Sequence, residues 1–214
     1  MRITWFGHAC FKLLSDSGVS VITDPFDENV GYDLPGEKAD IVTVSHQHYD
    51  HNFIEAVKGT PEIISEAGDF HVNNIRIKGV RSFHDDEGGR KRGFNIIYII
   101  EMDGIRVCHC GDLGHSLTRE QVDEIGRVDV LLIPVGGTYT VDADAAAEIV
   151  GKISPSVVIP MHFKTDRINF PIDGADKFLQ IMGEGTKMNT NTLEVTEQVI
   201  QGKGTRIIVL DYKK

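Results

Sequence analysis

The stretch "HQHYDH", residues 46–51, places three of the chain's nine histidines within six positions, with an aspartate among them. Imidazole and carboxylate groups fill an apolar core poorly, and crowding them together is costly unless a cation balances the cluster. The stretch follows directly on "DIVTVS", a run that predicts a strand over 40–45. It therefore indicates a metal site at the end of a strand.

Three further strand-like runs each end at a residue of the same chemistry. His84 follows "GVRSF", Asp112 follows "IRVCHCG", and His162 follows "PSVVIPM". Sites of α/β proteins commonly form in the loops beyond the C-terminal ends of strands. We therefore expect these three residues to lie beside the histidine-rich stretch.

The number of candidate ligands predicts two metal ions. A structural zinc takes four ligands, and a catalytic zinc takes three from the protein together with a water. We expect one ion to be held by His46, His48 and His84, and the other by Asp50, His51 and His162. Asp112 is the candidate for a bridge between the two ions. Asp85 and Asp86 remain alternatives to His84. The dominance of imidazole among the donors favours Zn²⁺, with Mn²⁺ and Fe²⁺ as alternatives.

Several nearby residues are candidates for supporting roles. Asp50 is expected both to bind a metal and to accept a hydrogen bond from the attacking water, and His115 is a candidate proton donor. His8 and Asp24 are expected close to the site, and Asp24 is a candidate for orienting a ligand, because ligating histidines commonly donate their second N–H to a carboxylate. Plain structural packing is the alternative for both. Strand alternation turns His109 away from the ligand face, so it is expected to pack near the site without binding metal.

The remaining pattern predicts an α/β protein. Short runs rich in valine and isoleucine indicate strands, the last of them over 205–212. Helix-like patterns cover 52–59, 118–126, 141–153 and 173–183. Thr118 and Gln121 have capping-box spacing. Because no linker or repeat divides the chain, we predict one domain over 1–214, with two sheets covered by helices.

Composition argues against several classes of function. The formal net charge of −10 disfavours a protein that coats nucleic acid. Neither a signal peptide nor a membrane-spanning segment is predicted, because no apolar run has the required length. The three cysteines, an odd number, suit the reduced thiols of a cytoplasmic protein. A small-molecule substrate and a homo-oligomer are both compatible with these features.

The stretch "HQHYDH" fits the H-x-H-x-D-H motif of the metallo-β-lactamase superfamily, and with His84, "GD" at 111–112 and "MH" at 161–162 the pattern is complete and in order. "TWFGHACF", "TDPF", "CGDLGH" and "IPVGGTYTVD" resemble a subgroup of small metal-dependent hydrolases that includes L-ascorbate-6-phosphate lactonase-like proteins. The resemblance covers nearly the whole chain. It implies a four-layer αββα sandwich, a dinuclear centre, and hydrolysis of a lactam, lactone, thioester or phosphodiester.

Two other functions stay open. Superfamily members with a di-iron redox site typically carry glutamate at the position of His48 together with a flavin domain, and neither is expected here. A binding or sensor module that keeps its metals as structure is the second alternative, and the ligand set alone does not separate it from an enzyme.

A basic run after His84 suggests the charge of the substrate. Arg90, Lys91 and Arg92 lie in a stretch bracketed by glycines, which predicts a mobile loop, and Lys164 follows the last ligand closely. These four residues are candidates for binding an anionic small molecule. The alternative is a solvated loop whose positive charges balance the acidic residues 85–87.

Overall fold

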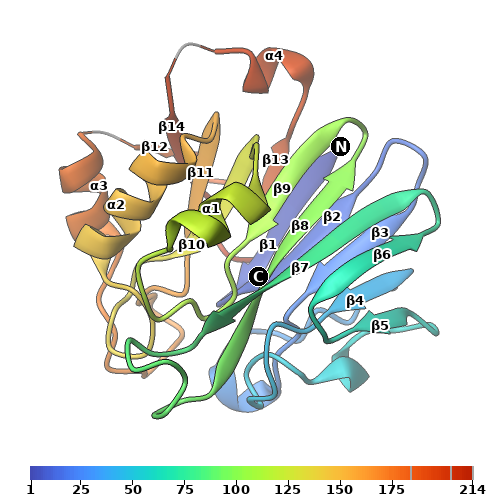
Figure 1. Cartoon of the computed structure of the whole chain (residues 1–214). Coiled ribbons are helices and arrows are strands. Elements are labelled where there is room, and N and C mark those ends of the chain that lie inside the picture. Colours follow the sequence, from blue (N-terminus) through green and yellow to red (C-terminus); the bar gives the residue numbers. More distant parts are fainter. Residues whose placement is uncertain (184, 203, 214) are drawn as a thin grey trace.

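The computed structural model describes residues 1–183, 185–202 and 204–213, and in it two mixed β-sheets face each other (Figure 1). The six-stranded sheet has the order β13-β1-β2-β3-β4-β5, and the eight-stranded sheet has the order β12-β14-β11-β10-β9-β8-β7-β6. The expected α/β sandwich is therefore confirmed.

The strands that are buried on both faces form where short apolar runs are rich in β-branched residues. The six-stranded sheet contains β1 (Arg2–Gly7), β2 (Cys10–Leu14), β3 (Ser20–Thr23), β4 (Ile41–Thr43), β5 (Glu62–Ile64) and β13 (Thr192–Glu194). The eight-stranded sheet contains β6 (Gly68–Val72), β7 (Ile75–Phe83), β8 (Phe94–Met102), β9 (Ile105–His109), β10 (Val130–Pro134), β11 (Val157–Met161), β12 (Thr186–Lys187) and β14 (Arg206–Val209).

Three helices, α1 (Arg119–Ile125), α2 (Ala143–Ile153) and α3 (Asp176–Met182), cover the outer face of the eight-stranded sheet (Figure 1). The capping box predicted for α1 is present. The Thr118 side chain accepts a hydrogen bond from the Gln121 amide, and the Gln121 side chain accepts one from the Thr118 amide. A further short helix, α4 (Glu197–Ile200), lies between β13 and β14 and was not predicted. Among the helices of the described ranges, none has both the length and the apolarity that crossing a membrane requires.

The layer over the six-stranded sheet differs from the expectation. The predicted helix over 52–59 is a single 3₁₀ turn, η2 (Ile54–Ala56), whose cap position makes no side-chain hydrogen bond. Another 3₁₀ turn, η1 (Glu28–Val30), contributes Val30 to the same buried cluster as Ile54 and Val57. A cluster that includes Phe26, Val30 and Ile168 packs these segments against the sheet. Turns and loops, rather than long helices, therefore form this outer layer.

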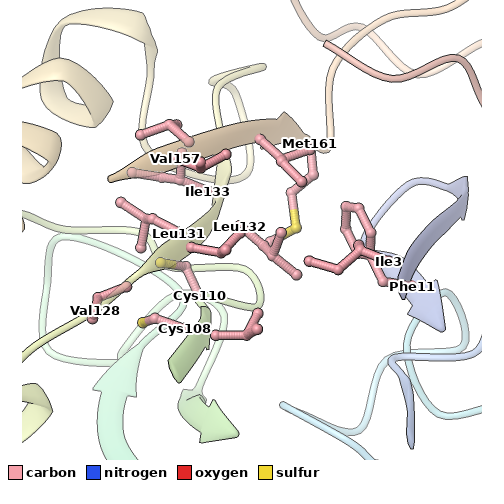
Figure 2. Packing of buried hydrophobic residues seen from close by; sticks show 14 of the residues in the cluster. Ile3, Phe11, Cys108, Cys110, Val128, Leu131, Leu132, Ile133, Val157 and Met161 are labelled. Carbon is pink, nitrogen blue, oxygen red and sulfur yellow. The ribbon is translucent and has the colours of Figure 1, made fainter. Parts of the chain in front are cut away.

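The main core lies between the two sheets. One buried cluster joins residues of both, and Figure 2 shows Leu132 and Met161 facing Ile3 and Phe11 of the opposite sheet. Tyr98 crosses this core and donates from its hydroxyl to the carbonyl of Val44, 3.1 Å away. The sheets are therefore fixed relative to each other close to the end of β4.

Strand direction explains where a site can form. In the six-stranded sheet, β1 and β3 are both antiparallel to β2, and β4 is parallel to β3, so these three run the same way. In the eight-stranded sheet, β7, β9 and β11 likewise share one direction. Their C-terminal ends meet at one edge of the sandwich.

Candidate metal centre

Six strands deliver their following residues to one cluster. His8 follows β1, Asp24 follows β3, His46 lies three residues beyond β4, His84 follows β7, Asp112 lies three residues beyond β9, and His162 follows β11. The grouping of strand ends inferred from four runs therefore extends to six. The same signal, a histidine or aspartate directly after an apolar run, was already present at His8 and Asp24.

Unusual backbone conformations turn three of these side chains inward. His8, Asp24 and His162 have φ angles of 52°, 40° and 49°, in the left-handed region that residues other than glycine seldom adopt. Gly111, with φ of 54°, precedes Asp112, and a Cβ there would lie 2.4 Å from Asn95 Oδ1. Such strain concentrates at functional sites, where the surrounding structure holds it in place.

The first group of ligand atoms comes from His46, His48 and His84, which offer nitrogens that all lie within 4.8 Å of one another. His46 Nε2 and His48 Nδ1 are 2.9 Å apart. The histidine-rich stretch forms a turn, in which the His51 amide donates to the His48 carbonyl. This turn brings the ring nitrogens of His46 and His48, which are two positions apart, to one point.

The structure favours His84 over its acidic neighbours for this group. Both oxygens of Asp85 accept hydrogen bonds from backbone amides of its own loop. Asp86 is exposed and pairs with Lys91. His84, by contrast, is buried, and its Nε2 lies 3.2 Å from Asp112 Oδ2.

The second group contains four residues, His8, Asp50, His51 and His162, whose ligand atoms also lie within 4.8 Å of one another. Three of them are the predicted set. The fourth, His8, was expected close to the site, and its Nε2 lies 3.1 Å from Asp50 Oδ2. His8 is therefore part of the cluster itself.

Asp112 lies between the two groups. Its Oδ2 is 3.2 Å from His84 Nε2 and 3.4 Å from His162 Nε2, and its Oδ1 is 3.3 Å from His51 Nε2. One buried carboxylate thus contacts a histidine of the first group and two of the second. This is the geometry that a bridging ligand needs.

Asp24 organises two of the histidines from behind. It accepts hydrogen bonds from the Ser45 amide (2.7 Å) and from the Ser45 hydroxyl (2.6 Å), and it lies 2.8 Å from His51 Nδ1. Because a carboxylate only accepts, the proton of a neutral His51 sits on Nδ1 and leaves Nε2 free to bind a cation. Ser45 Oγ lies 3.0 Å from His46 Nδ1, and this contact likewise fixes the orientation of the His46 ring.

Asn95 and Ser45 are organising residues that the sequence analysis missed. Asn95 is fully buried, accepts from the Asp112 amide at 2.9 Å and donates to the Cys110 carbonyl at 2.9 Å. It therefore holds the segment that carries Asp112. Neither an asparagine near the start of a strand nor a serine before a histidine has a distinctive pattern, so no local signal identifies them.

The electrostatics of the cluster suit a cation. Burial, together with the neighbouring His51, lowers the pKa of His46 to about 3, so its ring is neutral near pH 7. Burial opposes the charged form of His51, but Asp112 and Asp24 outweigh it and raise the pKa of His51 above its usual range. Burial likewise opposes ionisation of Asp112, yet His162 and His51 hold its pKa well below normal. The carboxylates therefore stabilise positive charge at this point.

Two buried atoms test whether a metal fits. Among the residues that the structure describes, His51 Nε2 and Asp112 Oδ1 make no hydrogen bond, although they lie 3.3 Å apart. Leaving buried polar atoms without a partner is costly. A divalent cation would satisfy both atoms at once, and imidazole nitrogens with carboxylate oxygens are donors that zinc, iron and manganese accept.

Two of the histidines expected at or near the site, His109 and His115, lie outside the cluster. His109 is buried between the sheets, and its Nε2 lies 2.8 Å from the Ala9 carbonyl. His115 does not reach the ligands: its Nδ1 donates to the Ser116 carbonyl and its Nε2 accepts from the Phe83 amide. Both ring nitrogens of His115 thus contact backbone and the side chain lines a neighbouring hollow, so these contacts do not support the expected proton-donor role.

A cavity of about 550 Å³ opens over the cluster. It is lined by Gln47, His48, Tyr49, Asp50, His84, Arg92, Asp112, Tyr139, His162 and Phe170. Of the four basic candidates, Arg92 alone is among these residues. Arg90 and Lys91 turn toward Glu87, and Lys164 donates to the Phe170 carbonyl. Arg90, Lys91 and Lys164 therefore do not line the cavity, and the pairing of Arg90 and Lys91 with Glu87 agrees with the alternative of a charge-balanced loop.

The chain is similar in sequence to known proteins. The model of a family described as the beta-lactamase superfamily domain matches residues 2–162. A UPF0173 metal-dependent hydrolase of Thermoplasma acidophilum is 34% identical over 191 residues, which cover 77% of this chain and 84% of that protein. Other archaeal relatives share the same name.

Solved structures agree with the family match. A Thermotoga maritima protein described as a Zn-dependent hydrolase of the metallo-beta-lactamase superfamily is 42% identical, with a TM-score of 0.84 and 99% of each chain covered. Igni18, described as a metallo hydrolase of Ignicoccus hospitalis, is 23% identical with a TM-score of 0.67, covering 91% of this chain and 99% of that one. The second likeness shows the fold alone.

Proposed function

The chain belongs to the metallo-beta-lactamase superfamily and, within it, to the UPF0173 metal-dependent hydrolases, and from this premise we propose that it hydrolyses a small molecule at a dinuclear metal centre. The observation that carries the proposal is the position of Asp112, whose two oxygens face histidines of both ligand groups. One bridging carboxylate between two sets of donors is what two neighbouring cations require.

We assign His46, His48 and His84 to one ion and Asp50, His51 and His162 to the other, with Asp112 shared. When bound, such a pair of divalent cations would supply Lewis acidity and would lower the pKa of a water molecule enough to provide hydroxide near neutral pH. The histidine-rich donor set favours zinc over manganese or iron. Asp24, Ser45 and Asn95 keep the donors in position.

Asp50 has a further role in this proposal. It lines the cavity, and His8 contacts its Oδ2 atom. Burial opposes ionisation of Asp50, but the hydrogen bond with His8 and the charge of His51 outweigh it and lower the pKa of its carboxyl. Asp50 therefore remains a carboxylate and can accept a hydrogen bond from the attacking water, which aims the water at the substrate.

The cavity limits the substrate in size. A volume of about 550 Å³ suits a small molecule rather than a polymer. The rings of Tyr49, Tyr139 and Phe170 line its wall and offer apolar contact. We propose an ester, lactone or phosphodiester as the bond that is cut, with a lactone suggested by the resemblance to lactonase-like proteins.

Metal analysis and a substrate panel test the proposal together. The protein is purified without added chelator, its metals are measured by elemental analysis, and the zinc-loaded and manganese-loaded forms are assayed with an aryl ester, a lactone and bis(4-nitrophenyl) phosphate. We expect about two metal equivalents per chain and turnover of at least one compound, which is lost in Asp112→Ala.

A fully loaded protein that cuts none of these bonds would favour a binding module. Iron content with visible absorption would instead favour a redox site. Folded protein that takes up no transition metal would overturn the assignment of the ligands.

A further inference from the structure

Arg92 differs from the other basic residues of its loop. It lines the cavity over the ligand cluster, and its guanidinium forms no ion pair with any acidic side chain in the ranges that the structure describes. Arg90 and Lys91, its two predecessors, both pair with Glu87. Arg92 is thus the one lysine or arginine among the described residues that line this cavity.

The loop that carries Arg92 is built around a buried carboxylate. Asp85 is 2% exposed, and its Oδ1 accepts from the amides of Glu87 (2.9 Å) and Gly89 (2.8 Å). Its Oδ2 accepts from the amides of Lys91 (2.9 Å) and Arg92 (2.7 Å). Four backbone bonds to one side chain therefore set the path of a loop that was expected to be loose.

Contacts with a second loop fix the side chain. Arg92 Nη2 donates to the Thr138 carbonyl at 3.1 Å, and the guanidinium lies 5.5 Å from the centre of the Tyr139 ring. Thr138 is itself held by a hydroxyl bond of 2.7 Å to the Pro171 carbonyl. A guanidinium stacked on an aromatic ring keeps its edge available for hydrogen bonds. Only one of its donors is used by the Thr138 contact.

We propose that Arg92 binds an oxyanion of the substrate, a carboxylate or phosphate group distant from the bond that is cut, and that Asp85 is the positioning residue that holds Arg92 for this purpose. The inference rests on the proposed function and names its substrate class as small, anionic and partly aromatic or apolar. An arginine fork matches two oxygens of either group, and the three rings of the wall would contact the remainder.

Two matched esters test the proposal. 4-Acetoxybenzoic acid carries a carboxylate that cannot reach its own ester, and its methyl ester is neutral. We compare the ratio of kcat/KM for the two compounds between zinc-loaded parent and variants, so that their different intrinsic reactivities cancel. Arg92→Gln is the test variant, and Arg90→Gln is the matched control, because it removes the same charge two residues away.

We expect Arg92→Gln to lower the preference for the charged ester by roughly tenfold, mainly through KM, while Arg90→Gln keeps the parent ratio. An unchanged ratio in Arg92→Gln would overturn the proposal, and so would an equal loss in Arg90→Gln. 4-Acetoxyphenyl phosphate is assayed in the same way. Of the carboxylate and the phosphate, the preferred oxyanion is the one whose ester has the larger ratio of kcat/KM to that of the neutral ester.

Asp85→Asn tests the positioning role. An amide offers one acceptor oxygen where the carboxylate offers two, so two of the four backbone donors lose their partner. We expect the same loss of preference as in Arg92→Gln, with unchanged metal content by elemental analysis. A parent-like ratio in Asp85→Asn would refute the positioning role.

An equilibrium measurement separates failure of this inference from failure of the proposed function. Benzoate and phenylphosphonate are titrated by calorimetry into zinc-loaded parent, Arg92→Gln and Arg90→Gln. If neither ester is hydrolysed, weaker anion binding in Arg92→Gln alone still supports the anion site. Equal affinities in all three proteins would reject it, whatever the activity.

Discussion

His8 Nε2 lies 3.1 Å from Asp50 Oδ2 and joins residues 42 positions apart. The contact links the end of β1 to the histidine-rich turn after β4. Burial and the neighbouring His162 lower the pKa of His8 to about 4, so the neutral ring donates its Nε2–H to the carboxylate. One oxygen of Asp50 is thereby held in place.

This contact predicts the effect of removing the donor. His8→Phe keeps the ring shape but not the N–H, and we expect the second metal to bind about 10–100-fold more weakly and turnover to fall by a similar factor. His8→Gln retains a donor and should recover part of both. Metal titration followed by steady-state kinetics measures the two effects. Equal metal affinity in His8→Phe and parent would contradict the role.

His48→Ala should remove one metal equivalent. His48 is the exposed member of the first group, so its loss disturbs the fold little and the metal directly. Elemental analysis after dialysis should give about one ion per chain instead of two, with activity reduced at least 100-fold. His71→Ala, at an exposed position of strand β6, is the control and should match the parent. Full metal content in His48→Ala would show that another residue completes this group.

Asp112→Asn should impair metal binding more than folding. An amide keeps the size of the side chain but loses the negative charge that faces His51, His84 and His162. We expect at least 100-fold weaker binding of the metals and a parent-like circular dichroism spectrum. A variant with both metals and normal turnover would exclude a bridging role for Asp112.

His109→Asn should retain both metals. The ring lies between the sheets and donates to the Ala9 carbonyl, so its loss acts on packing and on one buried hydrogen bond. We expect the free energy of unfolding to fall by about 1–3 kcal/mol. Chemical denaturation measures the loss of stability, and elemental analysis of the same sample measures the metal content. Loss of one metal equivalent would mean that His109 reaches the centre.

Glu37 predicts an acid-dependent part of the stability. Burial opposes its ionisation, but hydrogen bonds from Lys12 (2.7 Å) and Lys213 outweigh it and lower its pKa below the ordinary 4.5. Because the pKa of Glu37 is lower in the folded than in the unfolded protein, its contribution to the free energy of unfolding is present above pH 4.5. This contribution is lost as the pH falls through the pKa of the folded protein. Because the pair is partly exposed, Glu37→Gln should cost only about 0.5–1 kcal/mol at neutral pH.

The difference between Glu37→Gln and parent should shrink as the pH falls from about 5 toward 3. Urea denaturation across this range measures it. Glu62→Gln is the control, because Glu62 is exposed and its side chain has no partner within the described ranges. If the difference in the free energy of unfolding between Glu37→Gln and parent widened in acid, the assigned direction of the pH dependence would be wrong.

Local sequence determined the elements that depend on neighbours along the chain. The apolar runs predicted the strands that carry His46, His84, Asp112 and His162, because burial on two sides requires such composition. The cap of α1 was readable for the same reason, since Thr118 and Gln121 bond within one turn. The helix predicted over 52–59 was wrong, because a segment this short, without a side-chain cap, does not form a stable α-helix from its apolar spacing alone.

Only the tertiary structure decided which distant groups meet. The contact of His8 with Asp50, the hold of Asp24 on His51 and the clamp of Asn95 on the Asp112 segment each join different strands. The direction of a side chain is likewise a result of packing: Arg92 faces the cavity because Asp85 binds four amides of its loop, whereas Arg90 faces away. Residue types name the possible chemistry of a site, and strand packing selects which of them share it.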